Sequence, residues 1–166
     1  VLLKDDKTFP FIRITNEPFP KVEIIRSKNL FKDDNIYFGP YTDIGYLRNI
    51  IRILHKIFNL RTCSFYIDQD SIKNKKYSIC LDFHIDKCGG PCEGHVTEKE
   101  YNEIIKQVIS FLKGNSTMIK EEISAYMIKA SNMLDFEMAA IYRDQLRMIK
   151  SFLIKQKKVC RDFSNR

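Results

Sequence analysis

Two short apolar groups near the start of the chain differ in pattern from the longer stretches that follow. They flank the turn-forming run Asn16–Pro20 and comprise Phe11, Ile12 and Ile14, then Val22, Ile24 and Ile25. Short apolar runs separated by a proline-containing turn are typical of β-strands. Beyond residue 41, apolar residues recur every three or four positions, which is the period of a helix. The pattern predicts a predominantly helical α+β fold with a small β-rich part first.

The first two helical stretches carry start and stop signals. Thr42 is placed to cap the first. Thr97 and Glu100 form a capping box before the second helical stretch. The apolar face of that helix runs from Tyr101 to Leu112. Gly114 can end that helix in a left-handed conformation.

Two further helices form a predicted hairpin. The first is capped by Asn115, Ser116 or Thr117, and the second uses Asp135 as its cap and runs to about Lys157. The apolar face from Leu134 to Leu146 is too large for two short helices to hide. Such a hairpin is suited to meet another helical hairpin.

The predicted organisation has four consecutive parts. They are a β-rich segment (1–41), a helix with a Cys-rich metal-binding region and a capped helix (42–114), the helical hairpin (115–157), and a basic tail or linker (158–166).

Charge and composition narrow the class of protein. The 166 residues carry 28 Lys and Arg against 21 Asp and Glu, a net charge of +7, and much of the excess lies after Lys150. Such a tail is typical either of attraction to nucleic acid or of a solvated helix end. No long apolar run predicts a membrane span or a signal segment, so a reducing bacterial cytoplasm is the expected location. Because the chain begins at Val1, we expect it to be part of a longer protein.

Four of the five cysteines form a constellation with the spacing Cys63-x16-Cys80-x7-Cys88-x3-Cys92. Four thiolates suit a tetrahedral zinc ion or an iron–sulfur cluster, and the irregular spacing favours a cluster, with zinc as the alternative. Cysteines can also be buried free thiols that pack as small apolar groups. Two histidines, His84 and His95, are near enough in sequence to replace a zinc ligand. Cys160, remote from the others, is left out of the site, and its role is open.

The remaining motifs indicate no reaction. Tyr37–Tyr41 is interpreted as a packed turn before a helix, although its aromatic rings could instead stack on nucleic-acid bases. Paired carboxylates with metal spacing, a nucleophile–base pair and a phosphate-cradling glycine loop are all missing from the pattern. We therefore expect no catalytic residues and no small-molecule substrate, and the sequence identifies no DNA-contacting residue.

Seven motifs, in this order, resemble the UvrC family of bacterial nucleotide excision repair. They are Lys4–Lys7, Asn16–Pro20, Tyr37–Tyr41, Leu60–Cys63, Cys88–Gly94, Phe111–Gly114 and Leu134–Leu146. The resemblance implies a central, non-catalytic segment, from residue 1 to about residue 157, between a GIY-YIG nuclease domain that incises 3′ of a lesion and an RNase H-like domain that incises 5′ of it. It further implies an iron–sulfur cluster, [4Fe–4S], on Cys63, Cys80, Cys88 and Cys92, and contact with DNA in the full protein.

The same resemblance identifies the hairpin as a UVR motif, which in this family binds the similar hairpin at the C-terminus of UvrB. The residues expected to contact UvrB are Leu134, Phe136, Ala139, Ala140, Arg143 and Leu146. Phe136 is the expected anchor, because a central aromatic often dominates the energy of an interface. The two alanines permit close helix approach, and Arg143 with Asp144 would orient the partner through charge pairs. The alternative is that Phe136 packs inside its own chain, against the helix from Tyr101 to Leu112.

Two other classes of protein compete with this interpretation. An adaptor of the arginine-kinase-activator type also joins cysteine-bound zinc to a UVR hairpin, but repeated Cys-x2-Cys pairs mark that class and are missing here. A small zinc-bound nucleic-acid module would need basic residues around the cysteines, whereas the surplus charge lies mainly in the tail. The UvrC-like scaffold is therefore the favoured prediction.

Overall fold

A computed structural model describes residues 8–27 and 32–164, with the backbone alone from residue 155 onward. The chain divides into two compact units, residues 1–106 and 107–166, and the division falls within one helix, α4 (Glu98–Leu112). The Lys4–Lys7 motif lies outside the described residues, as do the side chains of Lys157, Cys160 and the basic tail. Within the described residues, no helix is both long and apolar enough to cross a bilayer.

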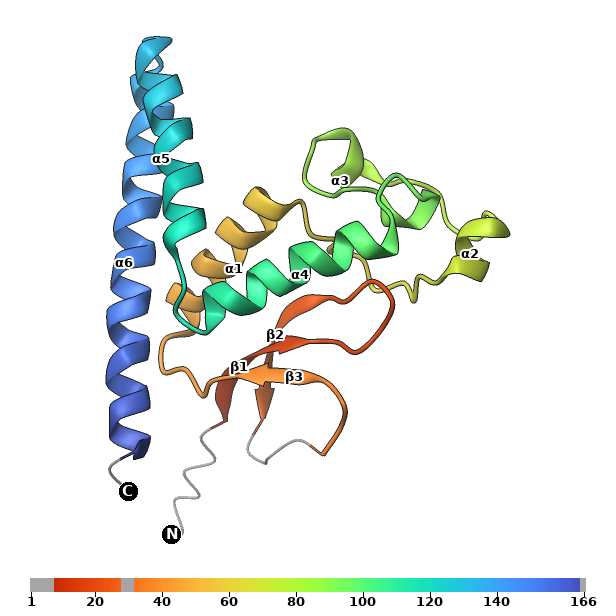
Figure 1. The fold of residues 1–166 in the computed structure, drawn as a ribbon, viewed down its shortest axis with the longest axis horizontal. Coiled ribbons are helices and arrows are strands. Elements are labelled where there is room, and N and C mark those ends of the chain that lie inside the picture. Colours follow the sequence, from red (N-terminus) through yellow and green to blue (C-terminus); the bar gives the residue numbers. More distant parts are fainter. Residues whose placement is uncertain (1–7, 28–31, 165–166) are drawn as a thin grey trace, which may run out of the picture. The chain divides into compact units, whose positions relative to one another are not determined.

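The first unit begins with a three-stranded antiparallel sheet in the order β2-β1-β3 (Figure 1). Its strands are β1 (Phe9–Ile14), β2 (Val22–Ser27) and β3 (Ile36–Phe38). Ile12 and Ile14 on the central strand are buried, so the first two predicted apolar groups are confirmed as paired strands. In the connection between them, Phe19 is also fully buried.

The Tyr37–Tyr41 segment begins in β3 and leaves the strand after Phe38, so that Gly39–Tyr41 form the turn, which is held against β1. Tyr41 N–H donates to the Pro10 carbonyl at 2.9 Å. Gly39 has φ +135°, and a Cβ there would lie 3.0 Å from the ring of Phe11. Only glycine combines that backbone conformation with so close a contact. The packed-turn interpretation of this motif is therefore confirmed.

Helix α1 (Ile44–Phe58) buries one apolar face, which includes Leu47, Ile50 and Leu54. Its cap is Asp43, whose carboxylate accepts the Tyr46 N–H, so the prediction of Thr42 as the cap was wrong by one residue. The segment that follows has only three short helices. They are α2 (Gln69–Lys73), α3 (Leu81–His84) and the 3₁₀ turn η1 (Pro91–Glu93).

The predicted capping box before α4 is present. Thr97 N–H donates to the Glu100 carboxylate at 3.0 Å, and Glu100 N–H donates to Thr97 Oγ1 at 3.2 Å. At the other end, Gly114 has φ +109° and donates to the Phe111 carbonyl, while Asn115 donates to Ser110. These two bonds form a Schellman motif, as the glycine predicted.

In the second unit, α5 (Thr117–Asn132) and α6 (Phe136–Ser164) form the predicted antiparallel hairpin (Figure 1). Ser116 precedes α5 without a capping side-chain bond, whereas Asp135 caps α6 by accepting the Met138 N–H at 3.2 Å. Helix α6 continues to Ser164 instead of ending near Lys157, so residues 158–164, predicted as a tail or linker, are helical.

Candidate metal centre and docking groove

The four predicted cysteines come from three different local structures. Cys63 lies in the irregular segment after α1, Cys80 directly precedes α3, Cys88 follows α3, and Cys92 is inside η1. All four line a single pocket, whose apolar walls include Phe65, Ile67, Phe83 and Pro91. Each is a free thiol; Cys80 is exposed, Cys92 is buried, and the other two are half-buried. The fold therefore brings the predicted constellation together.

The backbone between Cys88 and Cys92 depends on glycine. Gly90 has φ +69°, and a Cβ at this position would lie 2.7 Å from the ring of Phe83. The Gly90 N–H also donates to the Cys88 sulfur at 3.5 Å. Backbone amide donors of this kind stabilise a thiolate and are common around metal-bound sulfur.

Two of the four thiols, Cys88 and Cys92, have raised pKa values, mainly because they are buried. Burial is the largest cause of the raised pKa of Cys88, and its Gly90 hydrogen bond partly offsets that effect. The pKa of Cys92 is raised first by burial and then by the proximity of Cys63. A cation at the centre would reverse this balance, since it favours the thiolate form. Within the described residues, no three His, Cys, Asp or Glu side chains converge closely enough to hold one metal ion as they stand.

The two histidines considered as zinc ligands have other contacts. His95 stacks on Phe83, with ring centroids 4.6 Å apart, and its Nε2 lies 3.4 Å from the Glu93 carboxylate. His84 meets the same phenylalanine edge-on at 5.8 Å. Neither histidine lines the cysteine pocket. Of the residues considered as ligands from the sequence, the four cysteines line this pocket and the two histidines do not.

A second concave site lies on the helical hairpin. Its lining comes from both helices and comprises Met127, Ile128, Ser131, Asn132, Phe136, Ala139, Ala140 and Arg143. Four predicted contact residues are among them: Phe136, Ala139, Ala140 and Arg143. Leu134 is at the hairpin turn, 74% exposed, and Leu146 is half-buried outside the groove.

The anchor residue Phe136 is 65% exposed. The alternative that it packs entirely inside its own chain is therefore wrong. Nearby Ile128 and Met133 are also exposed, at 58% and 72%. A cluster of large exposed apolar side chains on a soluble domain marks an interaction surface.

The chain matches known proteins over nearly its whole length. Residues 9–111 match the model of the UvrC/Cho excinuclease middle domain, and residues 118–152 match the UvrB/uvrC motif. The chain is 45% identical to the UvrABC system protein C of Pelodictyon phaeoclathratiforme over 98% of its length, and 42% identical to that of Chlorobium luteolum over its whole length. The corresponding protein of Alkaliphilus oremlandii is 44% identical over 95% of this chain.

The chain belongs to the UvrC family. It spans about a quarter of the length of these UvrC relatives (25–26%). No solved structure matches it. The cysteine pocket lies within the part that matches the UvrC middle domain, and the groove lies within the part that matches the UvrB/uvrC motif.

Sequence reasoning missed part of each site in this UvrC segment. On the hairpin it missed Ile128, Ser131 and Asn132 on α5, although their three- and four-residue spacing places them on one helix face. At the cysteines it missed Arg61, whose guanidinium is fully buried and contacts Cys63. Arg61 belongs to the Leu60–Cys63 motif, but arginine is rarely buried, so the sequence did not indicate that its side chain would lie beside the thiols.

Proposed function

We propose that this chain is a non-catalytic segment of a DNA excision nuclease acting in nucleotide excision repair, and that it docks the UvrB subunit through its hairpin. In the same proposal, Cys63, Cys80, Cys88 and Cys92 hold a [4Fe–4S] cluster, or else a zinc ion, that stabilises the fold around them. The family description as an excinuclease implies a DNA substrate for the complete proteins. We expect this segment to meet DNA only as part of such a protein.

One observation carries the docking function: the groove between α5 and α6, with Phe136 exposed at its edge. Two helices in a hairpin can cover only part of each other's apolar surface, and a second hairpin completes a four-helix arrangement. The match to the UvrB/uvrC motif over residues 118–152 covers the groove and makes a similar hairpin the favoured occupant.

The charged residues at and beside the groove should contribute less binding free energy than its apolar residues. Arg143 lies 3.2 Å from Asp144, and Arg147 lies 3.8 Å from the same carboxylate. All three side chains are more than half exposed. Exposed ion pairs contribute little free energy, so we expect this cluster to affect orientation and association rate more than affinity.

Calorimetric titration of the chain with the C-terminal hairpin of UvrB tests the docking function. Phe136→Ala should weaken binding by more than about 1 kcal/mol, roughly fivefold in Kd. Met118→Ala is the matched control, because Met118 is also exposed (56%) but lies outside the groove. Equal affinities for the wild type and Phe136→Ala would remove Phe136 as the anchor.

The metal function is supported by the four thiols that line one pocket and by the amide donor to Cys88. When bound, a cluster or zinc ion would contribute folding free energy to a region with little regular structure. Iron, zinc and acid-labile sulfide are to be measured in chain purified without oxygen. About four irons and four sulfides per chain would support the cluster, and one zinc without sulfide would support the alternative. Absence of all three would contradict the metal function.

The adaptor class is the second candidate, since it too combines cysteines with a UVR hairpin. The match to the UvrC/Cho middle domain across residues 9–111 argues against it. A zinc-only result would leave the docking function in place and remove the cluster.

A further inference from the structure

Cys63 is held in place differently from the other cysteines. It is separated from Cys80 by sixteen residues, and residues 61–68 form neither helix nor strand. Cys80 and Cys92, in contrast, begin or lie within short helices. Cys63 therefore needs another source of order if it is to face the pocket.

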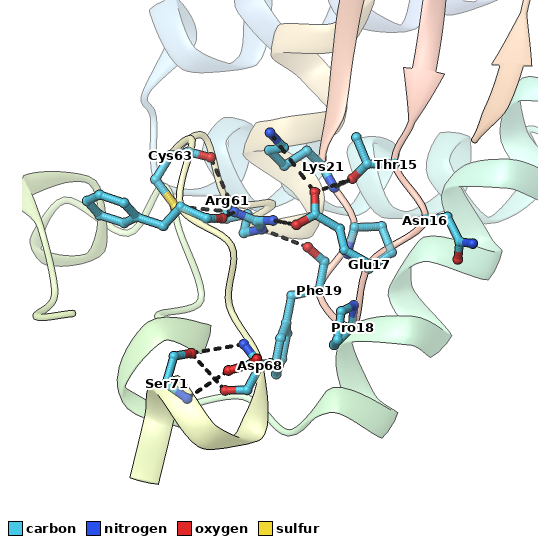
Figure 2. Close-up of polar contacts among 12 residues, drawn as sticks. Thr15, Asn16, Glu17, Pro18, Phe19, Lys21, Arg61, Cys63, Asp68 and Ser71 are labelled. Atoms are coloured by element: carbon cyan, nitrogen blue, oxygen red, sulfur yellow. Dashed lines mark hydrogen bonds and ion pairs between the residues drawn. The ribbon is translucent and has the colours of Figure 1, made fainter. Parts of the chain in front are cut away.

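That source is the buried guanidinium of Arg61, two residues earlier (Figure 2). Its Nη1 donates to the Phe65 carbonyl at 2.6 Å and lies 3.3 Å from the Cys63 carbonyl and 3.5 Å from the Cys63 sulfur. The segment from Arg61 to Phe65 thus curls around its own first side chain. Both the backbone and the sulfur of Cys63 are fixed by the same nitrogen atom.

The guanidinium is in turn fixed by the connection between β1 and β2. Its Nε donates to the Phe19 carbonyl at 2.8 Å, and its Nη2 lies 3.0 Å from Glu17 Oε2. Nη2 has no hydrogen bond of good geometry, so charge holds this pair together. The other Glu17 oxygen accepts the Thr15 hydroxyl at 2.6 Å. Figure 2 shows Arg61 between Glu17 on one side and Cys63 on the other.

These contacts use the shape of arginine as well as its charge. The side chain is fully buried and that of Glu17 is only 9% exposed, so each charge depends on the other. Lysine carries one ammonium group and cannot reach Glu17, Phe19 and Cys63 at once. A metal-bound thiolate at Cys63 would strengthen the bond from Nη1, because hydrogen bonds to ionised acceptors are stronger than neutral ones.

We propose that Arg61 is a positioning residue of the cysteine site, and that the Glu17–Arg61 pair orients the Cys63 sulfur toward the bound metal. This inference rests on the proposed metal function. Residues that orient metal ligands typically affect metal affinity by about 10- to 100-fold. The pair also connects the metal site to the sheet, since Glu17 belongs to the β1–β2 connection.

The test compares the full chain with Arg61→Lys and Glu17→Gln variants, all purified without oxygen. Glu23→Gln is the matched control, because Glu23 pairs with Arg13 in the sheet, outside the cysteine pocket. The first measurement is the rate at which excess EDTA, or a ferrous-iron chelator, removes the bound metal. The second is the alkylation rate of Cys63 relative to Cys92 in loaded protein, followed by mass spectrometry. Far-UV circular dichroism reports whether each variant is folded.

We expect Arg61→Lys to release metal about 10- to 100-fold faster and to raise the alkylation rate of Cys63 relative to that of Cys92 above the wild-type ratio. Glu23→Gln should match the wild type. If Arg61→Lys does not fold, Glu17→Gln decides, since it keeps the guanidinium and removes its counter-charge; it should accelerate release at least severalfold. If Arg61→Lys is folded, an unchanged rate of metal release and an unchanged ratio of Cys63 to Cys92 alkylation would overturn the inference and leave the metal function intact. If only Glu17→Gln is folded, the same result for that variant would do so. A wild type without metal would overturn both.

Discussion

The cysteine region and the helical hairpin are both incomplete by themselves, but in different ways. Residues 60–94 contain three short helices and irregular backbone, and the four thiols of the region surround one pocket. The hairpin has two long helices, the second of which is capped by Asp135, yet it leaves Phe136, Leu134 and Met133 largely exposed. The first region has little regular structure and brings four thiols to one pocket, whereas the second has regular helices and an apolar face that is largely exposed. Under the proposed functions, metal binding should stabilise the fold of the cysteine region, whereas UvrB binding should cover the exposed apolar face of a hairpin that is already folded.

The largest expected effect is loss of order at the cysteines. Cys92→Ser removes the most buried ligand and should abolish high-affinity metal binding. A ligand present at a thousand times its Kd stabilises the folded state by about 4 kcal/mol. We expect the thermal midpoint to fall by at least ~10 °C.

Thermal melts and limited proteolysis of residues 60–94 measure this loss, while hairpin binding to UvrB should persist. Cys160→Ser is the control, because Cys160 lies sixty-eight positions after Cys92 in the sequence and outside the predicted constellation. If Cys92→Ser leaves the thermal midpoint unchanged, the cysteine region is ordered without metal, and the contrast with the self-sufficient hairpin is wrong.

The second prediction separates the two faces of the hairpin. Ile123 on α5 is fully buried, so Ile123→Ala should destabilise the hairpin by about 3 kcal/mol. Phe136→Ala should change the free energy of unfolding by less than about 0.5 kcal/mol. Urea denaturation followed by circular dichroism measures both. Equal destabilisation by the two variants would mean that Phe136 supports its own fold instead of a partner.

The two regions also differ in how much of them could be predicted from sequence. The hairpin helices and the Asp135 cap follow from periodicity and capping chemistry, which are local, and half of the eight groove residues were among the predicted contacts. The short helices α2, α3 and η1 contain five residues or fewer, too few to produce a recognisable period. The cysteine spacing predicted which thiols lie around one pocket, but it did not predict the local structures that bring them there. Arg61 and Glu17 both lie in motifs that carry the family resemblance, but local patterns do not predict that two residues forty-four positions apart form an ion pair.

Two smaller misses have local causes. Thr42 and Asp43 are adjacent and both can cap a helix, but aspartate is the stronger N-cap residue, so Asp43 was the better choice from sequence. The end of α6 was set too early because its last turns are polar and lack an apolar period, although polar residues with long side chains still favour helix.

Leu134 offers a third, smaller test, in which stability and docking change in opposite directions. It has φ +60° at the end of α5, where it donates to the Ser131 carbonyl while Asp135 donates to Ala130. This is a Schellman motif with leucine in the position that glycine prefers. Leu134→Gly should raise the free energy of unfolding by about 1 kcal/mol and weaken binding to the UvrB hairpin.

Leu134→Ala keeps the strained backbone, so it should weaken binding without the gain in stability. Urea denaturation and calorimetry on the same samples measure both quantities. If Leu134→Gly binds UvrB as tightly as the wild type, the 74% exposed leucine is not a contact residue.

The smallest effect concerns the capping box where the cysteine region meets α4. The Thr97 N–H bond lowers the pKa of the Glu100 carboxyl group below its usual value. Because the folded-state pKa is the lower one, the stabilisation is present above the unfolded pKa and is lost as pH falls through the folded pKa. Glu100→Gln should lower the thermal midpoint slightly at pH 7, and its difference from the wild type should shrink as pH falls through the folded-state pKa of Glu100. Metal content should be the same in both proteins. A variant that loses metal would show that the cap of α4, and not the thiols alone, keeps the cysteine region in order.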